Sequence, residues 1–387
     1  MNLDNFDPSK ENHIIELEKI KKIIMNSINK VNLDLKGFTV LTEAATGYWQ
    51  FTPFIAAFAN ADTILCKLKN TKYGKPHEIK KNYENLISYF NLKQNFKFFE
   101  SSNDDIISTA DIVTNSGNVR PINAKFIKKM KKTGIISLMW EPWEFRDIDL
   151  DLTQCMKNGI CVIGVNEENS ILNVMKHDGE LIQQIFSDND ISLKNKNILL
   201  IAENRSALYM IKSLKKQDVN LDIISSQIPN DVISFEGNLV SSSLENLENF
   251  VSDKDFIIIN SHPITKPIIG KNGYISSKKF KMLSKAKIIL FFGTIDYDDL
   301  VKNGVPFLPN KKISPGYMGW KSDLLDPIPT IELNTLGLKS GEIVAKYRKS
   351  GLTYAQSIKK AVQSPYCLDF SVEQKTKYFS KSIHSNS

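Results

Sequence analysis

Short apolar runs alternate with helical stretches along most of this chain, and this alternation limits its possible folds more than any other feature. Strands separated by helices at such spacing predict a parallel sheet covered by helices on both faces. In the first half, the expected strands are Phe38–Leu41, Thr63–Cys66, Phe96–Phe99, Asp111–Thr114, Ile135–Met139 and Cys161–Val165, and the helices between them include Pro53–Ala59, His77–Tyr89, Ala124–Lys131 and Leu152–Lys157.

A second α/β pattern follows the polar stretch Ser187–Lys196. It opens with a buried strand, a tight turn and a helix that carries Leu208, Ile211 and Leu214 at helical spacing, as a nucleotide-binding βαβ unit does. The expected strands are Ile198–Ile201, Leu221–Ile224, Phe256–Asn260 and Lys287–Phe292, with a helix at Ser277–Leu283.

The predicted fold class is therefore α/β, with two Rossmann-like or flavodoxin-like parallel-sheet domains and a cleft between them. We expect a substrate domain with an N-terminal helix, a nucleotide-binding type of domain, and a C-terminal crossover whose helix packs back on the first domain. The expected boundaries are 1–186, 187–315 and 316–387, with a long helix at Ile171–Phe186, a strand at Thr330–Leu333 and a final helix at Ser340–Gln363.

The N-terminal segment from about Asn12 to Lys30 predicts an amphipathic helix. Its apolar face suits either core packing or the seam of a homodimer, and we expect a homo-oligomer. The residues of that face are Ile14, Leu17, Ile20, Ile23, Ile24 and Ile28.

Composition excludes several classes of function. A formal net charge of +7 comes from lysines spread over helical segments, which predicts solvated faces and no nucleic-acid partner. The four cysteines form no C-x-x-C pair, so neither a metal site nor a disulfide framework is expected. No signal peptide and no apolar run of about 20 residues is present, which predicts a cytoplasmic protein without membrane contact.

Polar segments follow four of the expected strands in the first half. In parallel sheets, ligands bind beyond the carboxyl ends of the strands, so these segments are candidates for holding a small-molecule substrate. Any one of these residues taken alone is more often a turn residue. The substrate-binding candidates are Glu43, Thr46, Asn115, Ser116, Asn166 and Glu167, with Tyr317 from a later aromatic segment that suits either a lid or packing of the crossover.

Two of these segments carry candidate catalytic side chains. Glu141 and Glu144 flank Pro142 and Trp143, and desolvation beside tryptophan would suit a general acid or base. The alternative is that they cap the next helix or pair with Arg146. Arg120 could clamp an anionic group with its planar fork, or form a surface ion pair.

The segments Ala110–Val113, Gly134–Ile136 and Asn158–Val162 resemble the catalytic domain of D-2-hydroxyacid dehydrogenases, whose wider relatives include S-adenosylhomocysteine hydrolase. The stretch Asp255–Thr265 resembles that family's H-x-P-x-T segment. The resemblance implies a two-domain enzyme that uses NAD or NADP. Within it, His262 is a candidate proton donor or a residue that lines the cofactor side.

The cofactor motif departs from the family pattern. The turn expected to carry G-x-G-x-x-G is Ala202-Glu203-Asn204-Arg205-Ser206-Ala207, and the family's catalytic arginine is matched by Phe292. Side chains of the turn could still bind a phosphate, as a weaker substitute for the glycine backbone. The cofactor-binding candidates are Asn204, Arg205, Ser206, Ser225, His262, Pro263 and Gly293.

Three functional hypotheses follow. The first is an NAD(P)-dependent oxidoreductase of the D-2-hydroxyacid dehydrogenase type, acting on a small polar or anionic substrate between the domains. The second is a non-redox enzyme, a lyase, hydrolase or ligase-like protein, that has lost dinucleotide binding. The third is a non-catalytic binding or assembly protein that uses its N-terminal helix as an interface.

Overall fold

The protein is represented by a computed structural model, which describes residues 3–101, 104–228, 233, 238–262, 264–315 and 317–370. The chain divides into two compact units. Unit 1 comprises Met1–Val174 and Asp326–Phe370, and unit 2 contains Met175–Leu325. The first boundary falls before helix α7 (His177–Asp188), and not after residue 186, because α7 packs against helix α8 (Ser206–Leu214) of unit 2.

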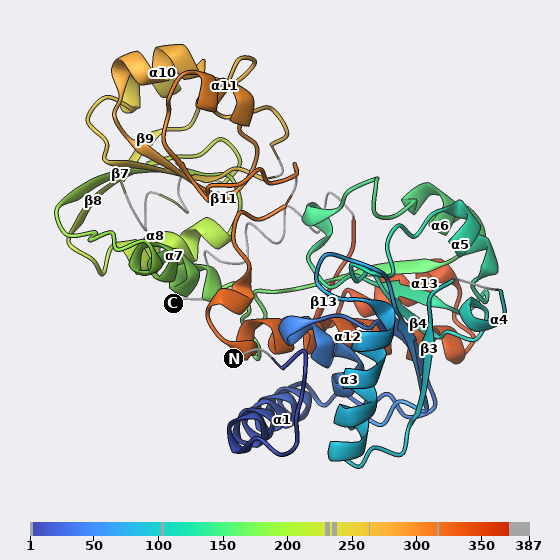
Figure 1. Cartoon of the computed structure of the whole chain (residues 1–387). Coiled ribbons are helices and arrows are strands. Elements are labelled where there is room, and N and C mark those ends of the chain that lie inside the picture. Colours follow the sequence, from blue (N-terminus) through green and yellow to red (C-terminus); the bar gives the residue numbers. More distant parts are fainter. Residues whose placement is uncertain are drawn as a thin grey trace. The chain divides into compact units, whose positions relative to one another are not determined.

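Unit 1 is built on a seven-stranded sheet in the order β13-β6-β5-β4-β1-β2-β3 (Figure 1). All neighbouring pairs are parallel except β13 with β6. The chain order reverses between β1 and β4, as in doubly wound sheets. The strands are β1 (Thr39–Glu43), β2 (Thr63–Lys67), β3 (Asn95–Phe99), β4 (Ile112–Thr114), β5 (Ile135–Ser137), β6 (Cys161–Val165) and β13 (Cys367–Leu368).

The central strands of this sheet read as continuous apolar runs because both of their faces are covered. Every residue of β4, β5 and β6 is buried, which is the pattern of a parallel sheet between two helical layers. The helices of unit 1 are α1 (Glu11–Val31), η1 (Gly47–Phe51), α2 (Thr52–Phe58), α3 (Pro76–Tyr89), α4 (Asp104–Ile107), α5 (Ala124–Lys129), η2 (Pro142–Glu144), α6 (Leu152–Asn158), α12 (Pro327–Lys349) and α13 (Tyr354–Ala361).

The C-terminal segment differs from the sequence expectation. The expected strand Thr330–Leu333 lies inside α12, which Asp326 caps by accepting the Ile328 N–H at 2.6 Å. Because α12 packs on β4, β5 and β6, it is buried on several sides and shows no clean helical stripe in sequence. The expected single helix Ser340–Gln363 is divided, since Thr353 starts α13 as a new N-cap.

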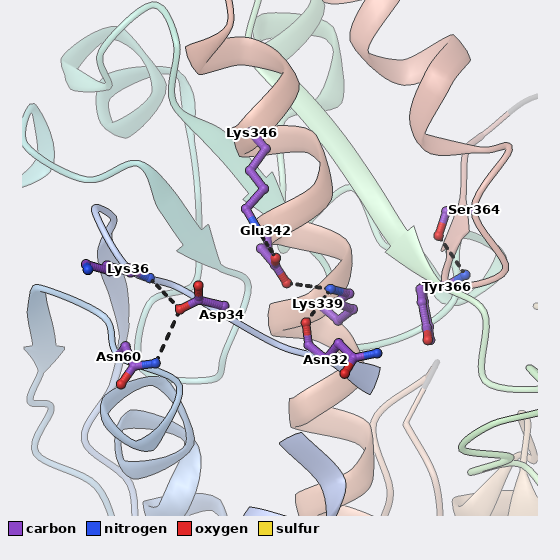
Figure 2. Close-up of polar contacts among 9 residues, drawn as sticks. All are labelled: Asn32, Asp34, Lys36, Asn60, Lys339, Glu342, Lys346, Ser364 and Tyr366. Carbon is purple, nitrogen blue, oxygen red and sulfur yellow. Dashed lines mark hydrogen bonds and ion pairs between the residues drawn. The ribbon is translucent and has the colours of Figure 1, made fainter. Parts of the chain in front are cut away.

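Helix α12 is tied to the N-terminal part of unit 1 by a lysine that also forms an ion pair within the helix. Lys339 Nζ donates to Glu342 Oε2 and to the carbonyl of Asn32, each at 2.8 Å, while Lys346 pairs with the other oxygen of Glu342. Figure 2 shows Lys339 between Glu342 and Asn32, the C-cap residue of α1. Residues more than 300 positions apart are joined here, which closes unit 1 around its sheet.

The apolar face of α1 is buried within unit 1. Leu17, Ile20 and Ile24 have no exposed surface and belong to the main core, and α1 packs on α12 and α2. Core packing, rather than a dimer seam, is therefore the use of this face.

The expected long helix Ile171–Phe186 is shorter, because an asparagine turn occupies its first residues. Asn169 Oδ1 accepts the N–H groups of Ile171 and Leu172, at 3.0 and 2.9 Å, and α7 starts only at His177. A side chain that bonds its own backbone in this way competes with helix formation.

Unit 2 repeats the doubly wound order with six strands, β12-β11-β10-β7-β8-β9, all parallel (Figure 1). Its order reverses between β7 and β10. The elements, besides α7 and α8, are β7 (Lys196–Ala202), β8 (Val219–Ile224), β9 (Asn238–Ser241), η3 (Leu247–Phe250), β10 (Phe256–Asn260), α10 (Ser277–Leu283), β11 (Lys287–Phe292), α11 (Tyr297–Lys302), β12 (Phe307–Leu308) and η4 (Ser322–Leu324).

The prediction of two parallel-sheet α/β domains is confirmed. The cleft expected between them stays a prediction.

Candidate functional site

The carboxyl ends of β1 and β4 meet where the strand order of unit 1 reverses. Glu43, the last residue of β1, is buried, and its Oε2 accepts the N–H of Asn118 at 2.8 Å. Beneath this contact, Thr114 Oγ1 lies 2.9 Å from Thr42 Oγ1 and 2.8 Å from Ser116 Oγ. Ser116 is thus held in a cluster of buried hydroxyls.

Asn115 joins β4 to the segment after β5. Its Oδ1 accepts the Met139 N–H at 2.8 Å, and the residue is 1% exposed. Its Nδ2 is buried and has no acceptor among the described residues. An unpaired buried donor costs about 1–3 kcal/mol, so this amide group is available for an acceptor that a ligand supplies.

Two guanidinium groups share one carboxylate and one indole next to Asn115. Arg120 Nη1 and Arg146 Nε donate to the same oxygen of Asp149, at 3.0 and 2.5 Å. Their Cζ atoms lie 4.8 and 4.9 Å from the ring centroid of Trp140. The two guanidinium groups therefore converge on one carboxylate and one indole ring, and guanidinium groups are the side chains that bind carboxylate and phosphate anions.

Glu141 is wholly buried directly after Trp140. Its Oε1 accepts the Glu167 N–H at 3.0 Å, and its Oε2 accepts from Trp143 Nε1. Burial raises the pKa of Glu141 to about 8. The two hydrogen bonds lower this pKa, and the nearby charges of Glu144 and Glu168 raise it. The carboxyl group is therefore mainly protonated at neutral pH.

Two of the other candidates, Glu144 and Asn166, hold the local structure. Glu144 Oε1 accepts the Glu141 N–H at 3.2 Å, so it caps η2, which is the alternative that the sequence left open. Asn166 Nδ2 donates to the carbonyl of Pro365 at 2.8 Å and its Oδ1 accepts the Glu168 N–H at 3.3 Å, so its amide ties the end of β6 to the chain before β13. Thr46, half-buried, precedes η1 without capping it by a side-chain hydrogen bond.

The candidates of unit 1 therefore lie along one edge of one sheet. Because β1, β4, β5 and β6 are parallel neighbours, the segments that follow them lie side by side at that edge. Sequence reasoning missed Asp149 as the partner of both arginines and Trp140 as their stacking surface. Arg146 was considered only as a partner of the glutamates.

In unit 2, the turn after β7 is closed by its own side chains. Asn204 Nδ2 donates to Asn260 Oδ1 at 2.7 Å and to the His262 carbonyl at 3.1 Å. Asn204 Oδ1 accepts the N–H of Ser206 at 3.1 Å and its hydroxyl at 2.8 Å. This network joins β7, α8 and β10 at the reversal of strand order.

The other cofactor candidates are also buried. Arg205 is 1% exposed, Ser225 is not exposed and its Oγ accepts the Ile228 N–H at 3.2 Å. Gly293 has φ of 149° and lies so close to Ser261 that a Cβ would come 2.1 Å from its Oγ, so only glycine fits there. Pro263 lies outside the described residues.

His262 stacks on Phe292, with ring centroids 4.4 Å apart and planes 11° from parallel. Both residues are buried, which agrees with a lining or structural part for His262. Tyr317 is 41% exposed and, like His262, belongs to unit 2, whereas the other substrate-binding and catalytic candidates belong to unit 1.

Comparisons with known proteins give the fold. No protein-family model matches the chain, and no curated protein matches it. Among solved structures, the chain is similar to the A chain of dipicolinate synthase from Bacillus subtilis, with a TM-score of 0.51 and 11% identity over 82% of this chain and 99% of that one. It is also similar to D-lactate dehydrogenase from Lactobacillus jensenii, with a TM-score of 0.46 and 14% identity over 75% and 99% of the two chains.

The chain therefore shares its two-unit α/β fold with the A chain of dipicolinate synthase. A third similar structure is the NAD-dependent formate dehydrogenase from Staphylococcus aureus, with a TM-score of 0.43 and 12% identity over 80% and 99% of the two chains. The resemblance predicted from the sequence is confirmed at the level of this fold.

The sequence resemblance to D-2-hydroxyacid dehydrogenases implies a dinucleotide at the turn after β7, but the residues here do not fit its pyrophosphate. The usual glycines expose backbone N–H groups to the phosphates. Here residues 203–206 are between 1% and 4% exposed, and the Ser206 N–H is already bonded to Asn204. The carboxylate of Glu203 adds a like charge beside the phosphate position.

The described part of the chain shows no group of three or more His, Cys, Asp and Glu residues placed to hold a metal ion. In that same part, no helix has both the length and the apolar character needed to cross a bilayer.

Proposed function

We propose that the protein is a cytoplasmic, non-redox enzyme of D-2-hydroxyacid dehydrogenase-like fold that performs acid–base chemistry on a small anionic substrate. The reaction takes place at the strand-end edge of unit 1. The observation that carries this proposal is the adjacency of a wholly buried carboxyl group, Glu141, to Trp140, on which two guanidinium groups stack.

Glu141 is the proposed general acid. A carboxyl group whose pKa lies near the working pH can both hold and release a proton, which is what acid–base catalysis requires. Burial supplies this pKa for Glu141, whereas an exposed glutamate would be fully ionised at neutral pH.

Arg120 and Arg146 are the proposed binding groups for the substrate anion. Both guanidinium groups pair with Asp149 and lie against Trp140. Arg120 Nε, Trp140 Nε1 and Asn115 Nδ2 are buried N–H donors without acceptors among the described residues. A carboxylate or phosphate offers several acceptors at once, so it satisfies these donors better than a neutral ligand.

The donors are closed from solvent, so we propose that Trp140, which is half-buried, moves when the substrate enters. The free energy of leaving the donors unpaired favours such an opening once a ligand supplies acceptors. The site then closes over the substrate and excludes water.

The test is a thermal-shift screen of small mono- and dicarboxylates, dipicolinate included, followed by turnover assays with any ligand that raises the melting temperature. Arg120→Ala should abolish the shift, and Glu141→Gln should keep the shift and abolish turnover. Lys97→Ala, an exchange of an exposed lysine on β3, is the control and should change neither. Full activity of both site variants would show that the site is misplaced.

A second candidate is an NAD(P)-dependent oxidoreductase acting as a biosynthetic homodimer. The observation in its favour is the strand order of unit 2, which reverses between β7 and β10 as in dinucleotide-binding domains. A rise in melting temperature with NAD+, NADH, NADP+ or NADPH would place this candidate first.

A further inference from the structure

The turn after β7 holds two carboxyl groups of the protein's own near the start of α8. Glu203 follows β7 directly, and Asp178 lies in the first turn of α7 and hydrogen-bonds the Ser206 side chain. Glu203 is buried and Asp178 is half-buried, and desolvation raises the pKa of each carboxyl group. In a dinucleotide-binding domain, the start of this helix receives the phosphates.

The carboxylate of Glu203 accepts hydrogen bonds from N–H groups of the loop after β8. Its Oε1 and Oε2 lie 2.9 and 3.1 Å from the Ser226 nitrogen, and the Ser226 hydroxyl donates to Oε2 at 2.9 Å. The N–H of Gln227 also donates to this carboxylate. The side chain thus crosses from the end of β7 to the end of β8 and is satisfied there.

Asn204 and Asp178 form hydrogen bonds with Ser206, the first residue of α8. Asn204 Oδ1 accepts both the N–H and the hydroxyl of Ser206, while Asn260 Nδ2 donates to the same hydroxyl at 2.9 Å. Donors that a phosphate would need are therefore bonded to protein acceptors. An incoming pyrophosphate would have to break these bonds and would lie beside two carboxyl groups, and both effects are unfavourable.

We infer that side chains of the protein replace the dinucleotide phosphates at this turn, so that unit 2 is a closed Rossmann-like domain that binds no dinucleotide pyrophosphate there. Glu203 accepts the hydrogen bonds of the N–H groups beyond β8, and Asn204 and Asp178 bind Ser206 at the start of α8. This inference concerns unit 2 alone and is independent of the acid–base chemistry proposed for unit 1.

The test combines isothermal titration calorimetry with hydrogen exchange on the full-length protein. NAD+, NADH, NADP+ and NADPH are each titrated into the wild-type protein, into Glu203→Gln and into Glu245→Gln, an exposed control in the same unit. We expect dissociation constants above about 1 mM for the wild type and the control. Amide exchange of Ser206 and Ser226 should be slow and unchanged by any of the four nucleotides.

Saturable binding to the wild type that slows exchange within residues 203–208 and 225–227 would overturn the inference. Saturable binding that leaves exchange in both segments unchanged would support it, because the nucleotide would then lie elsewhere. A gain of binding in Glu203→Gln alone would also support it, since removal of one charge would have opened the turn. The wild-type measurement decides the matter even if the variant does not fold.

Discussion

Arg120 Nη1 donates to Asp149 Oδ2 at 3.0 Å, and this oxygen also accepts from Arg146 Nε. The three side chains are between 10% and 16% exposed, so water screens their charges only weakly. Asp149 is therefore the group that allows two guanidinium groups to lie on Trp140 at once.

Replacement of this carboxylate should destabilise unit 1. Asp149→Ala leaves two positive charges close together with little solvent, and we expect the free energy of unfolding to fall by about 3 kcal/mol. Urea denaturation followed by circular dichroism measures it. Asp298→Ala removes the partner of Lys312 from a pair that is 67% and 83% exposed, and serves as the control. We expect that variant to change stability by less than about 0.5 kcal/mol; equal effects would refute the role of Asp149.

Glu141 should make stability depend on pH in a definite direction. Its pKa is about 8 in the folded protein against an ordinary value of 4.5, so the folded state binds the proton more tightly. Its contribution to stability is therefore largest below pH 4.5 and is lost as the pH rises from there to about 8. Melting temperatures of Glu141→Gln should fall less over that range than those of the wild type.

The control for this pH experiment is Glu100→Gln, an exposed exchange after β3 in the same unit. Its melting curve against pH should run parallel to that of the wild type. If the curve of Glu141→Gln is also parallel, the Glu141 carboxyl group is not held protonated in the folded protein.

Gly164 in β6 should not tolerate a side chain. A Cβ there would come 2.5 Å from Cδ of Pro142, a rigid ring that immediately follows Glu141. We expect Gly164→Ala to cost at least about 1–3 kcal/mol and to disturb the Glu141 site. Gly159→Ala is the comparison, because a Cβ at Gly159 meets nothing within 4 Å and only its φ of 68° opposes alanine, at about 1 kcal/mol. Calorimetric melting of both variants would rank them, and the reverse order would contradict the packing.

The N-terminal helix offers a matched pair of isoleucines. Ile24 has no exposed surface, whereas Ile15 on the same helix is 63% exposed. Ile24→Ala should therefore cost about 2–5 kcal/mol of unfolding free energy, and Ile15→Ala less than about 0.5. Similar losses in both, or a change of mass in solution with Ile15→Ala alone, would favour α1 as an interface instead of a core helix.

Local sequence patterns predicted the sheets well and the last helix poorly. Strands such as Cys161–Val165 are buried on both faces, and a continuous apolar run is the direct consequence of that burial. The start of helix α12 was wrongly predicted as a strand. Its residues are buried on all sides, including Glu332 and Asn334, so the sequence shows no apolar stripe at helical spacing.

The sequence predicted which residues of the site follow a strand, but not which of them are in contact. Polar segments after parallel strands placed Glu43, Asn115, Arg120 and Glu141 along one edge, since parallel strands end together. The pairing of Arg120 with Asp149 was not predictable, because the residues lie 29 positions apart and meet through the course of a loop.

The sequence by itself determined the α/β class, the positions of the central strands and the loss of glycine after β7, because each is a local property of residue type and spacing. Tertiary structure alone decided which donors and acceptors are already satisfied. A buried carboxyl such as Glu203 or Glu141 reads in the sequence like any surface glutamate, and only the surrounding chain sets its solvation, its partners and its proton affinity.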